Sequence, residues 1–102
     1  MNSARDIYIA IADDHPLVRK GIVAFICAIN SRFKVVAEAG TGKELLDQIS
    51  KAEIKPDVCI VDVNMPVMNG YETVQQIKEQ YPQIRCLALT IYDQSDFPIL
   101  KM

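Results

Sequence analysis

The sequence predicts an α/β fold built on a parallel sheet, and three observations support this prediction. Short apolar runs of the length of a buried strand recur along the 102 residues. Segments with apolar side chains at helical spacing separate these runs, an alternation typical of parallel sheets with right-handed crossovers. Two of the runs stop at carboxylates, at Asp13 and at Asp62, and ligands bind at such strand ends in open α/β sheets. The length predicts one domain, over residues 1–102.

The first half of the chain predicts two strands and two helices. A nearly unbroken apolar run predicts a strand at 6–12 that is buried on both faces. Pro16 suits the first turn of the helix that follows, which is expected to end near residues 30–31. Residues 34–39 are less apolar and predict an edge strand. Thr41 and Glu44 fit a capping box at the start of the next helix. The expected apolar stripes are Val18, Ile22, Phe25, Ile26 and Ile29 in the first helix, and Leu45, Leu46, Ile49 and Ala52 in the second.

The second half predicts two further strands with a helix between them. Strands are expected at 57–62 and from residue 84 to 90 or 91, and a helix at 71–80 that Pro82 ends. Residues 93–96 are expected to open a fourth helix.

Composition excludes several classes of protein. A net charge of -2 gives no electrostatic argument for a nucleic-acid surface. No signal peptide and no apolar segment long enough to span a bilayer are found, so a cytoplasmic location without membrane contact is expected. The three cysteines lie in apolar runs and are interpreted as buried side chains of a reduced protein.

Three carboxylates form the main candidate site. Because the strands that precede them are expected to be neighbours, Asp13, Asp14 and Asp62 should converge at one edge of the sheet. Carboxylate oxygens are the ligands that Mg²⁺ prefers, and one carboxylate can serve as a nucleophile. Thr90 ends the fourth strand as Asp62 ends the third, so its hydroxyl is expected to face a phosphoryl group on Asp62.

Other motifs are given structural interpretations. Residues 40–43, GTGK, do not complete a phosphate-binding loop, because the pattern needs Gly at Ala37 and Ser or Thr at Glu44. His15, the only histidine, lies beside a helix cap and is interpreted as structural. Arg19 is expected on a solvated helix face.

The motifs together resemble the receiver domain of two-component response regulators. Residues 62–70, DVNMPVMNG, resemble the family's phosphoacceptor motif D-x-x-M-P-x-x-[ND]-G, and Asp13 and Asp14 resemble its acidic pair. Residues 87–90, LALT, resemble its fourth strand and switch hydroxyl. Residues 13–19, DDHPLVR, are most similar to the NarL/FixJ subfamily, whose members usually carry a C-terminal helix-turn-helix domain.

The resemblance implies a flavodoxin-like doubly wound sheet of order 2-1-3-4 and a role for each site residue. Asp62 would accept a phosphoryl group from a histidine kinase or phosphotransfer protein. Asp13, Asp14 and Asp62 would ligate Mg²⁺ together with the backbone carbonyl of Asn64. Thr90 would act as the switch, and the chain would not be an enzyme. DNA would be contacted only through a C-terminal domain absent from these residues.

The resemblance also has departures. The family has a fifth strand, with a lysine at its end, and a fifth helix, and this chain is expected to lack them and to be incomplete at its C-terminus. The fourth strand would then be an open edge, and self-association through that edge is expected. Two alternatives stay open. One is a magnesium phosphohydrolase with Asp62 as nucleophile, and the other is a degenerate receiver that acts as a dimerisation module without phosphorylation.

Overall fold

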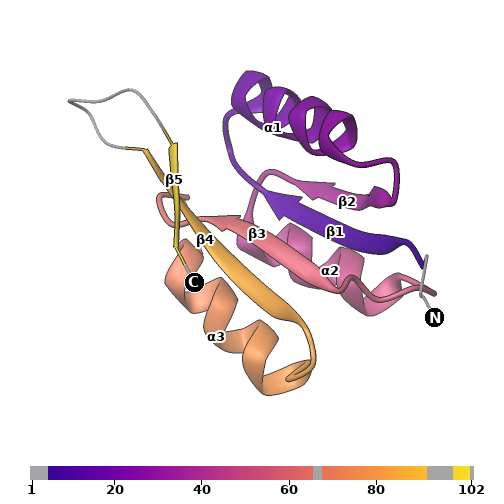
Figure 1. The fold of residues 1–102 in the computed structure, drawn as a ribbon. Coiled ribbons are helices and arrows are strands. Elements are labelled where there is room, and N and C mark those ends of the chain that lie inside the picture. Colours follow the sequence, from indigo (N-terminus) through magenta and orange to yellow (C-terminus); the bar gives the residue numbers. More distant parts are fainter. Residues whose placement is uncertain (1–4, 66–67, 92–97, 102) are drawn as a thin grey trace.

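The structure, a computed structural model, describes residues 5–65, 68–91 and 98–101, the last four and residues 90–91 by their main chain only. Strands and helices alternate along the chain from β1 to β4, and a short strand follows (Figure 1). The elements are β1 (Ile7–Ala12), α1 (Pro16–Ile29), β2 (Phe33–Ala39), α2 (Gly42–Lys51), β3 (Val58–Asp62), α3 (Gly70–Gln80), β4 (Arg85–Ile91) and β5 (Pro98–Lys101).

The sheet has the order β2-β1-β3-β4-β5, and its first four strands are parallel. The predicted order 2-1-3-4 is therefore confirmed, with β2 at the edge. Asp62, the last residue of β3, lies opposite Leu89 of β4, and Ala12, the last residue of β1, lies opposite Val61. The carboxyl ends of these strands thus meet at one edge of the sheet.

Residues 98–101 form an antiparallel strand, which corrects the expectation of a helix after β4. They pair with residues 88–91, Thr90 opposite Ile99. The edge of β4, which was expected to be open, is therefore paired at residues 88–91. The argument for self-association through this edge does not hold for these four residues. The physical reason is that an unpaired edge leaves N–H and C=O groups without partners, so a nearby extended segment pairs with it. Residues 93–96, where the helix was expected to begin, lie outside the described residues.

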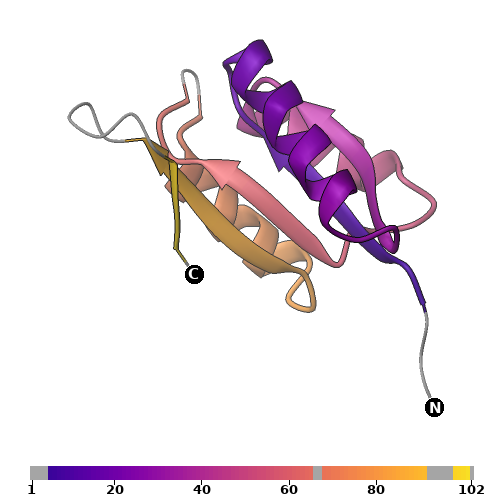
Figure 2. The same ribbon diagram turned by 45° about the horizontal axis from the view of Figure 1, so that its top comes forward.

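The helices divide between the two faces of the sheet (Figures 1 and 2). Ala10 and Ala12 of β1 face α2 and α3 and pack with Leu45, Ile49 and Ile77. The intervening residues, Ile9 and Ile11, face α1 and pack with Ile26. Successive strand residues point to opposite faces, so helices on both sides explain why the β1 run is apolar throughout.

Helix α1 is less completely buried than its apolar stripe predicts. Ile26 is buried, and Ile22 and Val23 pack beside it against the sheet. Phe25 is 66% exposed and Ile29 57% exposed, because they lie at the margins of a contact face centred on Ile26. Cys27 is also exposed, contrary to prediction, whereas Cys59 is buried and Cys86 is partly buried.

Candidate functional site

The loop between β1 and α1 carries the first half of the site. Asp13 directly follows β1 and is fully buried. Its backbone N–H donates to the Ala39 carbonyl of β2 at 3.0 Å, which extends the sheet by one residue. Its Oδ1 accepts the backbone N–H of His15 at 2.8 Å. This bond fixes the carboxylate above the strand end and leaves Oδ2 free.

The end of β3 carries the second half. Asp62 is 2% exposed, and its Oδ1 accepts the backbone N–H of Asn64 at 2.9 Å. Asp13 and Asp62 are thus held in the same way, each by the amide two residues later in the chain. In both cases one carboxylate oxygen is bonded to the main chain and the other is left for a further partner.

Three further residues of the 62–70 motif, Met65, Asn69 and Gly70, anchor the loop after Asp62. Met65 is buried in the core beneath α2 and α3. Asn69 caps α3 in a complete capping box with Glu72, with bonds of 3.0 and 3.2 Å. At Gly70 a side chain would collide with the main chain of Asp62 and Val63. The motif therefore holds the end of β3 tightly against the start of α3.

Four side chains converge at the carboxyl edge of the sheet. Oxygen or nitrogen atoms of Asp13, Asp14, His15 and Asp62 all lie within 4.8 Å of one another. The Nδ1 atom of His15 is 2.9 Å from Asp14 Oδ1, 3.1 Å from Asp13 Oδ1 and 3.9 Å from Asp62 Oδ2. The predicted convergence of the three carboxylates is therefore present, and a histidine lies with them.

Three carboxylate oxygens of this cluster are buried and lack a hydrogen-bond partner among the described residues: Asp13 Oδ2, Asp14 Oδ1 and Asp62 Oδ2. Asp14 Oδ1 is close to the His15 ring, but the contact is not aligned as a hydrogen bond. Buried polar atoms without partners are rare in native proteins and point to an unseen partner. Three hard oxygen donors of like charge fit a divalent cation such as Mg²⁺.

The electrostatics of the cluster agree with this interpretation. Burial raises the pKa of the Asp62 carboxyl, and the negative charges of Asp13 and Asp14 raise it further, against the hydrogen bond from Asn64. The hydrogen bond to Asp13 and the charge of Asp14 raise the pKa of His15. The contributions of the neighbouring carboxylates to both shifts have the sign expected of a negative site, whose charge favours a cation that enters it.

The expectation that Arg19 lies on a solvated helix face is wrong, whereas the interpretation of His15 as a structural residue stays a prediction. The Arg19 guanidinium donates to the Asp13 carbonyl at 2.7 Å and lies 3.4 Å from Glu38. It therefore positions the acidic loop. The His15 side chain makes no helix-capping hydrogen bond and lies at the carboxylates instead. The one signal in the sequence that could have indicated both residues is their place within the DDHPLVR string.

The roles of all the predicted site residues stay predictions, those of Asn64 and Thr90 included. Asn64 is exposed and lies two residues after Asp62, and only its N–H contact is defined. Thr90 lies in β4 one residue beyond Leu89, the partner of Asp62 in the sheet. The Thr90 hydroxyl lies outside the described part of the chain.

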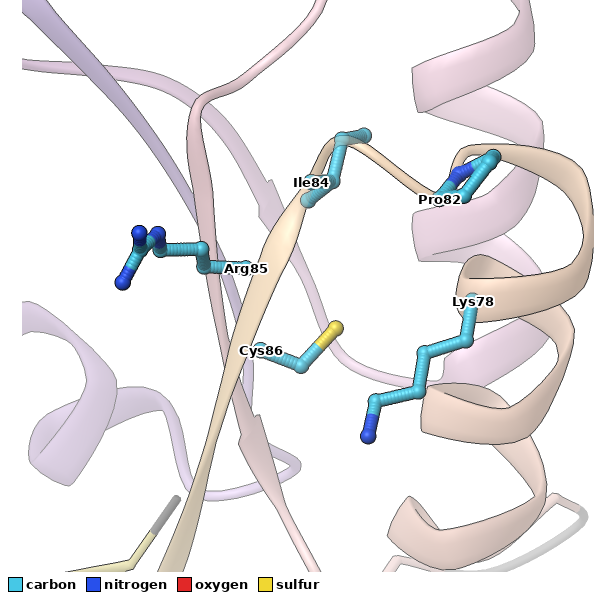
Figure 3. Close-up of a pocket in the computed structure, with 5 residues that line it drawn as sticks. All are labelled: Lys78, Pro82, Ile84, Arg85 and Cys86. Carbon is cyan, nitrogen blue, oxygen red and sulfur yellow. The ribbon is translucent and has the colours of Figure 1, made fainter.

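A surface pocket lies at the other end of the sheet. It is lined by Lys78 and Pro82, which belong to α3 and the turn after it, and by Ile84, Arg85 and Cys86 at the start of β4 (Figure 3). This end of β4 pairs with the first residues of β3, so the pocket is separated from Asp62 by the length of the strand. The acidic cluster, and not this pocket, is the candidate site.

None of the helices in the described ranges is long and apolar enough to cross a membrane.

Comparisons with known proteins agree with the fold and the site. The chain is 36% identical over 91 residues to the transcriptional regulatory protein DegU of Brevibacillus brevis, covering 89% of this chain and 37% of DegU. It is 41% identical over 87 residues to the response regulator VraR of Staphylococcus aureus, covering 84% of this chain and 40% of VraR. The chain thus spans less than half the length of these relatives, which are NarL/FixJ-type regulators.

Solved receiver domains have a fold similar to that of this chain. The isolated receiver domain of RcsB from Salmonella enterica, determined with a phosphomimetic beryllium fluoride, matches 87% of this chain and 64% of its own with a TM-score of 0.76 at 27% identity. The receiver domain of AraT from Geobacillus stearothermophilus matches 86% of this chain and 67% of its own with a TM-score of 0.75 at 33% identity.

The response regulator receiver domain model matches residues 9–100, and the chain therefore belongs to this family.

Proposed function

We propose that this chain is a phosphoacceptor of two-component signalling that takes a phosphoryl group on Asp62 from a histidine kinase or phosphotransfer protein. One observation carries the proposal: Asp62 Oδ2 is buried without a hydrogen-bond partner in the described ranges, beside two further carboxylates at the carboxyl edge of the sheet. Membership of the receiver family supports the same role.

The reaction is a displacement at phosphorus. Asp62 Oδ2 would form a bond to the phosphorus atom as the bond to the donor's imidazole nitrogen breaks, and the imidazole would leave. The hydrogen bond from Asn64 holds Oδ1 and orients Oδ2 toward the incoming group. Such transfers depend mainly on positioning and on charge neutralisation.

Mg²⁺ would be held by Asp13, Asp14 and Asp62, with the Asn64 carbonyl as a further ligand. When bound, the ion supplies positive charge that offsets the repulsion between these carboxylates and a phosphoryl group. The free oxygens of Asp13 and Asp14 support this assignment, because the backbone already satisfies Asp13 Oδ1.

Signalling would depend on Thr90 and on parts of the protein beyond these residues. Thr90 follows Leu89, the residue of β4 that pairs with Asp62, and a hydroxyl at this sequence position would sense a new dianionic group. Any contact with DNA would require a domain outside the present chain. The proposed location of the protein is the cytoplasm.

The test is intact-mass measurement after incubation with acetyl phosphate and Mg²⁺. The wild-type chain is expected to gain one phosphoryl group, stable in acid and labile in base, and Asp62→Asn to gain none. Asp57→Asn is the matched control, because Asp57 lies just before the same strand at its other end.

Two outcomes would contradict the proposal. No adduct despite Mg²⁺ binding would favour the module that acts by interaction alone. Continuous hydrolysis of acetyl phosphate, at a rate that Asp62→Asn abolishes and without a stable adduct, would favour a phosphohydrolase.

A further inference from the structure

The His15 imidazole lies at the acidic cluster although nothing in the helix requires it there. His15 is the N-cap residue of α1, a position where a side chain usually accepts a backbone N–H, but its ring makes no such bond. The ring instead places Nδ1 within 3.1 Å of an oxygen of Asp13 and of Asp14. The side chain is 58% exposed, so burial does not force this position.

The distances match those between ligands of one octahedral ion. For metal–ligand bonds of about 2.1 Å, neighbouring ligands are about 3.0 Å apart and opposite ligands about 4.2 Å apart. Nδ1 lies 2.9 Å from Asp14 Oδ1, the spacing of neighbouring ligands, whereas its 3.1 Å contact with Asp13 Oδ1 is a hydrogen bond to the oxygen that the main chain already holds. Its distance of 3.9 Å from Asp62 Oδ2 approaches the spacing of opposite ligands.

The carboxylates around the ring have donor atoms available. Asp13 and Asp62 are 0% and 2% exposed, and in each the Oδ2 atom has no hydrogen-bond partner among the described residues. Asp14 Oδ1 is also buried and has no hydrogen-bond partner among the described residues. With Nδ1 added, the donor set contains three oxygens and one imidazole nitrogen.

This donor set differs from one made of oxygens alone. Mg²⁺ prefers oxygen ligands and gains little from an imidazole, whereas first-row transition ions bind imidazole well. We infer that His15 supplies a nitrogen ligand through Nδ1 and shifts the selectivity of the site toward divalent transition ions such as Co²⁺. The inference rests on the proposed metal site and adds a ligand to it.

The test is calorimetric titration of the untagged chain with Mg²⁺ and with Co²⁺, at mildly alkaline pH, for the wild type and His15→Phe. Phe keeps an aromatic ring and removes both nitrogens. The expected result is that His15→Phe lowers the affinity for Co²⁺ by about tenfold or more, since even outer-shell partners of metal ligands are typically worth 10- to 100-fold. The affinity for Mg²⁺ should change by less than about twofold.

A second readout is independent of affinity. His15 is the only histidine of the chain, so its ring protons give unambiguous NMR signals. Bound Co²⁺ should shift these signals by far more than those of other residues at the cluster, as expected for a directly ligated imidazole, and Mg²⁺ should leave them nearly unchanged.

Three outcomes overturn the inference. If His15→Phe changed the Co²⁺ and Mg²⁺ affinities equally, the ring would affect the site without selecting between the two ions. If the Co²⁺ affinity were unchanged, Nδ1 would not be a ligand. Absence of Mg²⁺ and Co²⁺ binding in the wild type would overturn the metal site itself. The wild-type Mg²⁺ titration therefore separates failure of the proposed function from failure of the histidine ligand.

Discussion

Asp57 and Asp62 lie at the two ends of β3 and have opposite environments. Asp57 accepts the backbone N–H of Tyr8 at 2.9 Å and the Arg5 guanidinium at 3.0 Å. The bond from Tyr8, aided by Arg5, lowers the pKa of its carboxyl. Asp62 has one oxygen without a partner and two carboxylates beside it, and its pKa is raised, mainly by burial.

The difference is the one expected between a structural carboxylate and a carboxylate that binds an external group. At the amino end of the sheet, Asp57 joins β1 to β3 and its charge is satisfied within the chain. At the carboxyl end, the described residues offer Asp62 no cationic partner except the His15 ring, 3.9 Å away. Perturbed carboxylates with unsatisfied atoms cluster at functional sites, and the two ends of one strand show both cases.

The largest expected effect is from substitution at Gly70. Gly70→Ala would place Cβ within 2.5 Å of Val63 Cα and against the main chain of Asp62. Because backbone atoms cannot move aside easily, we expect a loss of about 3 kcal/mol or more in the free energy of unfolding. Urea denaturation measures this loss.

Gly21→Ala provides the matched control. Gly21 lies in the exposed part of α1, and a Cβ there meets nothing within 4 Å. This variant should gain up to about 1 kcal/mol from helix propensity. If Gly70→Ala and Gly21→Ala lowered the free energy of unfolding by the same amount, the tight contact at Asp62 would not be required.

The second prediction concerns metal. Mg²⁺ at 100 times its dissociation constant should stabilise the wild type by about 2.7 kcal/mol relative to EDTA. Asp62→Asn should lose most of this gain, because it replaces one ligand, and Asp57→Asn should retain it. Thermal denaturation of the three proteins with Mg²⁺ and with EDTA checks this, and equal gains in all three would place the cation elsewhere.

The third prediction is measured without divalent ions. Asp62→Asn should then be more stable than the wild type, by on the order of 1 kcal/mol, because it removes a buried charge repelled by two neighbours. The Asn oxygen can still accept the N–H of Asn64. A variant less stable than the wild type in EDTA would show that the carboxylate is compensated inside the chain.

Much of this architecture is predictable from the sequence. The bounds of β1 and β3 were predicted to within one residue, because a strand covered on both faces is an unbroken apolar run. The convergence of Asp13, Asp14 and Asp62 follows from the same reasoning, since the ends of neighbouring parallel strands share one edge.

Other features depend on tertiary contacts that no local pattern contains. Residues 98–101 are four residues beside a strand edge, too few for periodicity to distinguish strand from helix. The direction of the Arg19 side chain is set by the Asp13 carbonyl and Glu38, which lie on other elements. His15 contacts its chain neighbour Asp14, and it also lies near Asp62, which only folding brings close.

The smallest expected effect is the pH dependence that Asp57 contributes. Its pKa in the folded chain lies below the ordinary value of 3.8, so the unfolded chain binds more protons in acid than the folded one. The stabilisation by Asp57 is therefore complete above about pH 4 to 5 and is lost as the pH falls through the folded pKa. We expect roughly 1 kcal/mol, because the Arg5 side chain is 67% exposed and its ion pair is screened by water.

Asp57→Asn isolates this contribution, because Asn can still accept the Tyr8 N–H but does not titrate in this range. The difference in unfolding free energy between the wild type and this variant should be largest near neutral pH and should vanish in acid. Urea denaturation over a pH series measures the difference. If the difference in unfolding free energy between the wild type and Asp57→Asn were the same at every pH, the charge of Asp57 would contribute nothing to stability. The contrast between Asp57 and Asp62 would then rest only on the geometry of their hydrogen bonds.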